Sequence, residues 1–312
     1  MSVLGLDTSC YTTSIAVVDG PEVLDDCRIV LRVPQGERGL QQSKALFQHV
    51  QNLPELMERV DAHHRGWQAI AVSTRPRPVD GSYMPVFTAG HGLARSLAAA
   101  LGLPLFETTH QEGHIAAAAF TTDDLPADEP FLAFHLSGGT TELIRAVPGE
   151  RGYALDLVGG TLDLHAGQLV DRVGVAMGLG FPAGPALEEI AHASSGRISG
   201  AIKAKVIGTQ CNLSGAEAAA QRLLAGGADR ADVAHELLVC LAGTFAAMAT
   251  HAARQEGLMT VCFIGGVASN RLLRARMMES LTAAGLRACF APPRLSSDNA
   301  VGVAFLGQQF LR

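Results

Sequence analysis

Two stretches of the sequence share one plan and decide the expected fold. Residues 4–19, LGLDTSCYTTSIAVVD, combine an apolar segment, a turn of small polar residues and a second apolar segment. About 130 residues later, residues 136–144, LSGGTTELI, repeat this strand–turn–strand plan. Such a repeat is typical of a duplicated hairpin in a fold of two lobes with a ligand between them. The alternative is two unrelated hairpins, because glycine and threonine are common in such turns.

The rest of the chain alternates segments of strand and helix character, which is typical of the α/β class. Runs of β-branched and apolar residues predict strands, and apolar residues spaced three and four apart predict helices that pack by one face. The expected strands are residues 3–6, 14–18, 28–33, 69–73, 103–106, 131–136, 142–146, 154–157 and 260–264. The expected helices are residues 40–60, 87–101, 167–177, 184–193, 231–255, 270–284 and 299–311.

The composition indicates a folded, soluble chain with a sizeable core. Of the 312 residues, 48% are hydrophobic and 17% are charged, a balance that excludes a disordered chain. The opening residues lack the basic and apolar segments of a signal peptide, and no apolar run approaches the roughly 18 residues of a membrane span. We therefore expect a cytoplasmic protein that does not contact a membrane.

The net charge and the cysteines restrict the partners and the redox chemistry. A net charge of −6 excludes a basic surface over the whole chain, so RNA binding would need a local patch or a partner subunit. The six cysteines show no CxxC spacing, which favours buried reduced thiols over a disulfide framework or a zinc knuckle.

Two histidines in the run THQEGH form a candidate metal clamp. Thr108 or Thr109 can cap a helix that starts at His110, and Glu112 has the spacing of a capping box with Thr109. In such a helix His110 and His114 lie one turn apart on one face, where they can hold an ion together. The alternative is a polar first turn in which one histidine only caps the helix.

The position of Glu112 argues against a metalloprotease of the HExxH type. That mechanism needs a glutamate directly after the first histidine, where it can activate a metal-bound water. Glu112 comes two residues after His110, about 200° around the helix, and therefore points away from an ion held by the pair.

Asp298, in the segment SSDNA before the last expected helix, is a candidate third ligand. Two imidazoles and one carboxylate leave coordination positions open for a substrate, as in a catalytic metal site. The alternative is that an acidic or amide side chain of this segment caps the helix. The ligand set suits both iron and zinc, so the sequence leaves the ion open between them.

Two glycine turns are candidate phosphate-binding loops. Ser137-Gly138-Gly139 follows one expected strand, and Gly265-Gly266 follows another and leads into a helix. Glycine lets backbone N–H groups approach an anion, and a helix N-terminus adds a favourable potential. Taken singly, each can also be an ordinary turn. The sequence contains no P-loop or Rossmann glycine motif, which disfavours those nucleotide-binding folds.

Two further features leave a choice between structure and function. His135 lies in an expected buried strand and His165 at an expected helix start, so each is either structural or faces a ligand cleft. The turn FPAGP, residues 181–185, either shapes a pocket for a sugar or base or only breaks the chain before a helix.

Seven motifs occur in a characteristic order. They are LGLDTSCYTTSIAVVD, THQEGH, LSGGTTELI, AGQLVDRVGVAMGLGFPAGP, NLSG, IGGVASNRLLR and SSDNA. In this order they resemble the TsaD family of tRNA N6-adenosine threonylcarbamoyltransferases, formerly labelled Gcp or O-sialoglycoprotein endopeptidase, over nearly the whole chain. The resemblance implies a two-lobed actin/Hsp70/sugar-kinase-like (ASKHA) fold with a duplicated mixed β-sheet. The lobes are expected at residues 1–127, onto which helix 299–312 packs back, and at 128–298, with the ligand in the cleft between.

The resemblance also implies roles for individual residues. The implied metal ligands are His110, His114 and Asp298, around one divalent ion of iron or zinc. The positions implied to bind the nucleotide are His135, Leu136, Ser137, Gly138 and Gly139 around the phosphates, Asp171 and Gly184 at the nucleoside, and Asn270 at the adenylate. The implied catalytic residues are Ser9 and Thr12.

The family's chemistry implies the cofactors and partners. A threonylcarbamoyl group passes from threonylcarbamoyl-AMP to N6 of a tRNA adenosine, and AMP leaves. The expected ligands are therefore ATP, AMP or threonylcarbamoyl-AMP, together with tRNA bound through a complex with TsaB- or TsaE-like partners. A homodimer or heterodimer is also expected. The chain does not resemble TsaB itself, which lacks the histidine pair.

Several positions depart from the family pattern. Tyr11 and Thr12 replace an Asp–Glu pair, Thr140 replaces a histidine, and Arg75 and Arg77 stand in a turn where glycines are usual. Two more departures in the later helix replace acidic residues, at Leu164 and Gln168. This pattern suggests a divergent paralogue that keeps the metal and nucleotide positions. Such a paralogue either uses another acceptor or has become a non-catalytic nucleotide-binding subunit.

Overall fold

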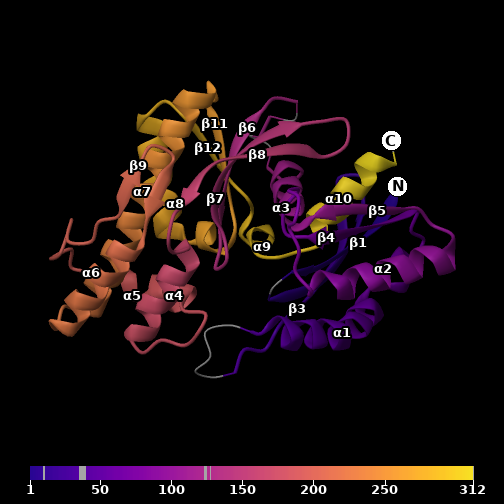
Figure 1. Cartoon of the computed structure of the whole chain (residues 1–312), viewed down its shortest axis with the longest axis horizontal. Helices are drawn as coiled ribbons and strands as arrows, with labels where there is room; N and C mark the ends of the chain where they lie inside the picture. Colours follow the sequence, from indigo (N-terminus) through magenta and orange to yellow (C-terminus); the bar gives the residue numbers. More distant parts are fainter. Residues whose placement is uncertain (10, 35–39, 123–124, 127, 312) are drawn as a thin grey trace. The chain divides into compact units, whose positions relative to one another are not determined.

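A computed structural model describes residues 1–9, 11–34, 40–122, 125–126 and 128–311. The chain divides into two compact units (Figure 1). Unit 1 comprises Met1–Asp123, Pro148–Leu155 and Arg294–Arg312, and unit 2 comprises Asp124–Val147 and Asp156–Pro293. The sequence placed the lobe boundary between residues 127 and 128. Residue 127 lies outside the described residues.

Unit 1 contains a five-stranded sheet in the order β3-β2-β1-β4-β5. β1, β2 and β3 are antiparallel neighbours, whereas β4 pairs parallel with both β1 and β5. Its strands are β1 (Ser2–Ser9), β2 (Thr12–Asp19), β3 (Glu22–Val30), β4 (Ala69–Arg75) and β5 (Leu105–Thr109). Its helices are α1 (Gln42–Arg59), η1 (Ala62–His64), α2 (Phe87–Leu101), α3 (His110–Ala119), α9 (Pro293–Ser296) and α10 (Val301–Phe310).

Helices cover both faces of this sheet because its central strands are apolar on both sides. Leu4 and Leu6 of β1 pack with α1 and α2, while Val3 packs with α3 and α10 on the other face. Alternate side chains of a strand point to opposite faces, so an unbroken apolar strand is expected where both faces are covered. At Gly5 an added Cβ would lie 2.6 Å from the carbonyl oxygen of Ala300, so the chain entering α10 lies directly on β1.

Unit 2 contains a seven-stranded sheet in the order β12-β11-β6-β7-β8-β10-β9. Its members β8-β7-β6-β11-β12 repeat the order of the first sheet, with β6 antiparallel to β7 and parallel to β11. This repeat confirms the duplication predicted from the two hairpins. The strands are β6 (Phe131–Leu136), β7 (Thr141–Pro148), β8 (Tyr153–Thr161), β9 (Lys205–Ile207), β10 (Gln210–Asn212), β11 (Thr260–Ile264) and β12 (Arg287–Phe290).

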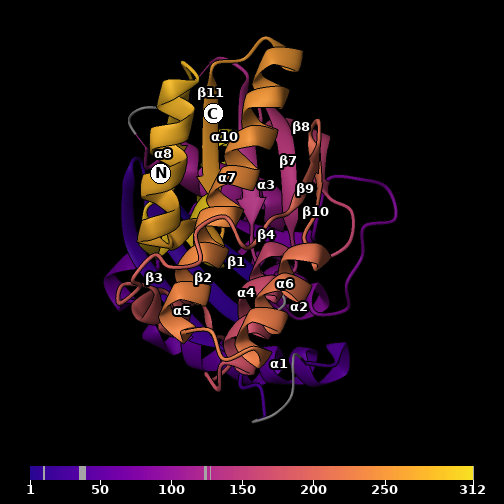
Figure 2. The same ribbon diagram turned by 90° about the vertical axis from the view of Figure 1, so that its left-hand side faces the viewer.

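The core of unit 2 lies between this sheet and its helices, with α7 and α8 in front of the strands in Figure 2. Phe134 of β6 contacts Phe245 of α7 and Phe263 of β11. By length and composition α7 could cross a bilayer, but 67% of its most apolar window is buried, as expected of a core helix. The helices are α4 (Ala166–Ala176), α5 (Gly184–Ala191), α6 (Ser214–Ala225), α7 (Arg230–Glu256), η2 (Gly266–Ser269) and α8 (Arg271–Ala283).

Two predicted strands are displaced along the chain. β3 ends at Val30 rather than at residue 33, because a turn at Gly20 starts it earlier and its pairing with β2 ends at Thr12. β5 begins at Leu105 because Gly102, with φ +64°, ends α2 in a left-handed turn. The five described cysteines are free thiols, as expected, but only Cys211, Cys262 and Cys289 are buried, whereas Cys27 and Cys240 are half-buried. Cys10 lies outside the described residues.

Candidate metal centre and nucleotide loops

The first turn of α3 fixes the position of the histidine pair. Thr109 Oγ1 accepts a hydrogen bond from Glu112 N at 3.2 Å, and Glu112 Oε2 accepts one from Thr109 N at 3.0 Å. This capping box confirms the helix start predicted at His110. The Glu112 carboxylate also accepts from the hydroxyls of Thr108 and Thr109. Because Glu112 is engaged in the cap, it is not placed as a peptidase base.

His110, His114 and Asp298 converge within unit 1. The two Nε2 atoms lie 3.1 Å apart, and Asp298 Oδ1 lies 3.6 Å from His110 Nε2 and 3.5 Å from His114 Nε2. Donors bound to one tetrahedral or octahedral ion at bond lengths of about 2.0–2.2 Å lie roughly 2.8–3.6 Å apart. Among the described residues these three are the group whose donor atoms could hold an ion together. The donor set therefore fits one divalent metal.

Asp7, near the end of β1, orients His110. Its fully buried carboxylate accepts hydrogen bonds from Ser9 N at 2.9 Å and Ser73 Oγ at 2.7 Å, and faces His110 Nδ1 at 2.9 Å. Burial opposes ionisation, but His110 and these hydrogen bonds lower the pKa of Asp7. An ionised carboxylate can only accept, so Nδ1 carries the proton and Nε2 faces His114 and Asp298.

The electrostatics of the cluster favour one positive charge at its centre. Burial disfavours the imidazolium, but the Asp7 carboxylate outweighs it and raises the pKa of His110 to about 9. Burial, together with repulsion from His110, lowers the pKa of His114. Metal ligands bind in their deprotonated form. A bound cation would therefore take the place of the second proton of the His110 imidazolium, the one on Nε2.

The loop between α9 and α10 presents Asp298. Asn299, rather than Asp298, caps α10, since its Oδ1 accepts from Val301 N at 3.0 Å and Gly302 N at 3.4 Å. The Asp298 carboxylate is thereby directed to the histidines rather than to the helix end. At Gly302 an added Cβ would lie 1.8 Å from Gly113 O, so the backbones of α3 and α10 touch. This contact brings ligands that are almost 190 residues apart in the sequence to one place.

The implied catalytic residues lie beside Asp7. Ser9 and Thr12 are cross-strand partners in the β1–β2 hairpin, and their exposed fractions are only 2% and 7%. The side chain of Ser9 is buried beside the Asp7 carboxylate. Its backbone N–H supports Asp7, so the hairpin turn is linked to the metal cluster through that carboxylate.

In unit 2 the two glycine turns lie at one edge of the sheet. β6 and β11 are parallel neighbours, with Ile264 opposite His135, so the turns after them are adjacent. Gly265 has φ +97°, and an added Cβ would lie 2.3 Å from Leu136 O. Only glycine suits this backbone and this close approach. The sequence predicted each turn, whereas their adjacency comes from the strand order.

The N-terminus of α4 lies against the first turn. Gly167 N donates to Ser137 O at 3.1 Å, and an added Cβ at Gly167 would lie 2.6 Å from Gly138 Cα. Gly138 and Gly139 are exposed, with no atom near an added Cβ. A helix N-terminus beside exposed backbone N–H groups favours an anion. His135 and Leu136 are buried within β6, ahead of the turn.

The remaining nucleotide-binding candidates occupy helix ends of unit 2. Asp171 of α4 accepts from Ala183 N at 2.8 Å, and burial raises the pKa of this carboxyl. The bond places Asp171 next to Gly184, the first residue of α5. Asn270 caps α8, since its Oδ1 accepts from Leu273 N at 2.9 Å, which leaves its amide N–H₂ group for a ligand.

Comparison with known proteins identifies the family. The family model of TsaD, described as tRNA N6-adenosine threonylcarbamoyltransferase, matches residues 37–305. The chain belongs to the TsaD family. Proteins of that name from Thermus thermophilus and Aromatoleum aromaticum are each 32% identical. The match with the Thermus protein covers 97% of this chain and 91% of that protein. The match with the Aromatoleum protein covers 98% of this chain and 90% of that protein.

Solved structures support the ASKHA fold expected from the sequence. HypF from T. kodakarensis superposes with a TM-score of 0.65 at 19% identity, over 99% of this TsaD-family chain and 47% of HypF. The ROK hexokinase from Thermus thermophilus gives a TM-score of 0.53 at 20% identity, over 100% and 99% of the two chains. At these identities the likeness concerns the fold alone. The chain spans about half the length of the HypF proteins it matches.

Sequence reasoning missed two side chains of this TsaD-family protein that support the candidate metal ligands. Asp7 and Ser73 lie near the ends of neighbouring strands β1 and β4, and both are fully buried. The available signal was an acidic residue after an unbroken apolar strand, where a carboxylate needs partners. Asp7 contacts His110 directly, and Ser73 acts through its hydrogen bond to Asp7. Both contacts join residues far apart in the sequence and depend on the sheet order.

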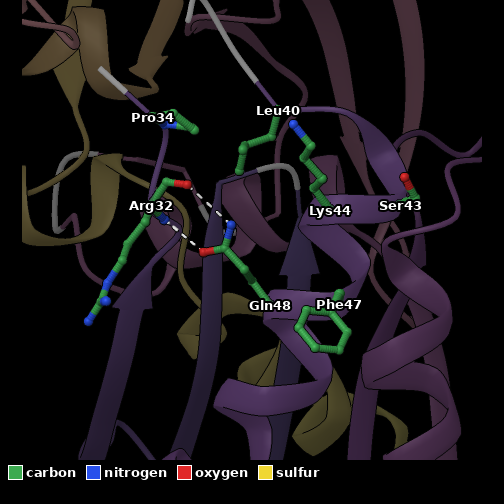
Figure 3. Close-up of a pocket in the computed structure, with 7 residues that line it drawn as sticks. All are labelled: Arg32, Pro34, Leu40, Ser43, Lys44, Phe47 and Gln48. Atoms are coloured by element: carbon green, nitrogen blue, oxygen red, sulfur yellow. Dashed lines mark hydrogen bonds between the residues drawn. The ribbon is translucent and has the colours of Figure 1, made fainter. Parts of the chain in front are cut away.

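A separate surface pocket of unit 1 lies beside α1 (Figure 3). It has a volume of about 390 Å³ and is lined by Arg32, Pro34, Leu40, Ser43, Lys44, Phe47 and Gln48. Gln48 forms its wall by pairing with the backbone of Arg32 at 2.8 and 3.2 Å. None of the residues expected to bind metal or nucleotide lines this pocket.

Proposed function

We propose that this protein transfers a threonylcarbamoyl group from threonylcarbamoyl-AMP to N6 of a tRNA adenosine. Membership of the TsaD family supports a transferase that acts in tRNA modification. The observation that carries the proposal for this chain is the convergence of His110, His114 and Asp298 around a space that fits one ion. The carboxylate of Asp7 behind His110 is the support that such a ligand requires.

The three ligands would hold iron or zinc, with coordination positions left for substrate. When bound, the ion polarises and orients an acyl group that is already activated as an adenylate. The chain's own contribution is to hold the reactants in position, since the leaving group is AMP and little acid–base catalysis is needed. Asp7 fixes the tautomer of His110 for this purpose.

The nucleotide is assigned to the loops of unit 2. Ser137, Gly138 and Gly139 would bind phosphate through backbone N–H groups and the N-terminus of α4. His135 and Leu136 would support this turn from β6. Asp171 and Gly184 are proposed for the nucleoside, and the amide of Asn270 for the adenylate.

Ser9 and Thr12 are the proposed catalytic positions, where a hydroxyl replaces the acidic group expected at residue 12. The loss of that acid and of a histidine at Thr140 supports an alternative. A divergent paralogue would keep the metal and the adenylate but use another acceptor, or would serve as a nucleotide-binding subunit without turnover. Metalloprotease activity is disfavoured, because Glu112 caps α3.

The proposal includes the expected partners and location. With a net charge of −6, the chain would bind tRNA together with TsaB- or TsaE-like partners, as a homodimer or heterodimer, in the cytoplasm. The net negative charge disfavours RNA binding by this chain without a partner.

Two experiments test the proposed function. The first measures metal content and the affinity for ATP and for a carbamoyl-adenylate analogue, in the wild type and in His110→Ala. We expect His110→Ala to lose the metal, while His91→Ala, which removes a surface histidine paired with Glu107, retains it. Equal metal content in all three proteins would refute the assigned ligands.

The second experiment measures threonylcarbamoyladenosine in tRNA from cells depleted of their own TsaD and supplied with this chain. Restored modification supports tRNA adenosine as the acceptor. Metal and nucleotide binding without restored modification would favour the paralogue with another acceptor or without turnover.

A further inference from the structure

The side chain of Arg28 in β3 connects the first sheet to the loop that carries Asp298. Its Nη1 donates to Ser297 Oγ at 3.1 Å and to the main-chain carbonyl of Asp298 at 3.3 Å. All of these residues belong to unit 1. None of the sequence motifs contains Arg28, and it is not one of the proposed metal ligands.

The guanidinium of Arg28 has a fixed orientation. Asp26, two residues earlier on β3, accepts from Nε at 2.7 Å and from Nη2 at 2.5 Å. The exposed fractions of the two side chains are only 18% and 20%. A bidentate pair of this kind sets the plane of the guanidinium fork. The remaining Nη1 group is therefore directed at residues 297 and 298 rather than free to rotate.

The backbone around Asp298 is consequently held from two sides. Arg28 holds the carbonyl of Asp298 itself, and Asn299 Nδ2 donates to the carbonyl of Ser297 at 2.9 Å. The Asp298 carboxylate then lies within 3.6 Å of both imidazoles. We infer that Arg28 is a positioning residue that holds Asp298 at the distance needed to share an ion with His110 and His114. The inference rests on the proposed metal site.

Whether replacing Arg28 weakens or strengthens metal binding distinguishes a positioning role from simple charge repulsion. Arg28 is a cation near a site for another cation, so charge repulsion alone would weaken metal binding, and removing Arg28 would strengthen it. Positioning makes the opposite prediction. Arg28→Lys keeps the charge but loses the planar fork, so electrostatics predicts an unchanged affinity and positioning predicts a weaker one.

The test is a competition titration of the full chain with Zn²⁺ against a chromophoric chelator. Loss of a group that orients a metal ligand typically weakens affinity by about 10- to 100-fold. We expect Arg28→Met to bind Zn²⁺ at least about tenfold more weakly, with a smaller loss in Arg28→Lys and in Ser297→Ala. Arg59→Met is the matched control, since Arg59 pairs with Glu55 on the exposed face of α1, and the Zn²⁺ affinity of this variant is expected to be unchanged.

A double-mutant cycle shows whether Arg28 acts through Asp298. In an Asp298→Ala background, adding Arg28→Met is expected to cause no further loss of affinity. Thermal unfolding of the metal-free variants identifies any that fail to fold, and Arg28→Lys and Ser297→Ala then carry the test. Unchanged or tighter binding in the folded Arg28 variants, or an equal loss in the Asp298→Ala background, would overturn the inference. Absence of Zn²⁺ binding by the wild type would instead overturn the proposed metal site, and with it this role for Arg28.

Discussion

Substitution of Gly302 by alanine tests whether the contact between α3 and α10 brings the three proposed metal ligands together. In the native protein the two backbones touch, and an added Cβ would lie 1.8 Å from Gly113 O and 2.6 Å from Ala117 N. Ordinary van der Waals contact begins near 3.4 Å. Because both clashing atoms belong to the backbone, no side-chain rotation relieves them. The helices must separate by about 1.5 Å.

The same movement has two measurable consequences. Overpacking costs roughly 1–3 kcal/mol of stability, and a backbone clash of this size belongs at the upper end of that range. We therefore expect the free energy of unfolding to fall by about 3 kcal/mol. The gain of up to about 1 kcal/mol from replacing glycine in a helix only partly offsets it. A shift of about 1.5 Å would also take Asp298 from 3.5 Å to about 5 Å from the imidazoles. That spacing is too wide for one ion, so Zn²⁺ affinity should fall by about 100-fold or more.

Urea unfolding of the metal-free protein and Zn²⁺ competition provide the two measurements. Gly113→Ala is the graded comparison, because its added Cβ would clash with the Val303 side chain at 2.9 Å but would lie at an ordinary 3.7 Å from the Val303 backbone nitrogen. A loss of about 1 kcal/mol in the free energy of unfolding is expected. Gly92→Ala in α2 meets nothing within 4 Å and should stabilise by up to about 1 kcal/mol. A Gly302→Ala protein as stable as the wild type, with native Zn²⁺ affinity, would refute the argument.

Three further predictions concern other contacts of the fold. Burial lowers the pKa of His49 from 6.5 to about 4, so the folded state takes up its proton later than the unfolded state. The contribution of His49 therefore leaves stability undiminished above about pH 6.5 and lowers the free energy of unfolding by about 3 kcal/mol as the pH drops to 4. In His49→Gln the free energy of unfolding measured with urea should depend less on pH over that window. An unchanged slope would contradict the assignment. Asn299→Ala removes the cap of α10 and should lower the free energy of unfolding, measured with urea, by about 1 kcal/mol. If it lowers stability no more than an Asn→Ala change at an exposed position, the cap contributes nothing. Gly265→Ala forces a side chain onto a backbone with φ +97° and against Leu136 O; we expect a loss of at least about 2 kcal/mol together with weaker ATP binding, and native ATP affinity would separate this turn from the nucleotide site.

Local signals in the sequence were sufficient for much of the fold. The capping box of Thr109 and Glu112 spans four residues and fixes the start of α3, so that His110 and His114 lie one turn apart. Helix 87–101 and strand 131–136 were predicted with their observed bounds, since each has a regular apolar period. The ends of β3 and β5 were displaced, because strand ends depend on pairing partners as well as on composition.

The sequence by itself determined the duplicated α/β plan, the histidine pair and the glycine turns, because each is written in the types and spacing of neighbouring residues. Only the tertiary structure decided that Asn299 rather than Asp298 caps α10, that Asp7 supports His110, and that Arg28 holds the Asp298 loop. The last two contacts join segments separated by about 100 and 270 residues. They depend on strand order and on the close approach of two helices, and no local pattern of side chains encodes either.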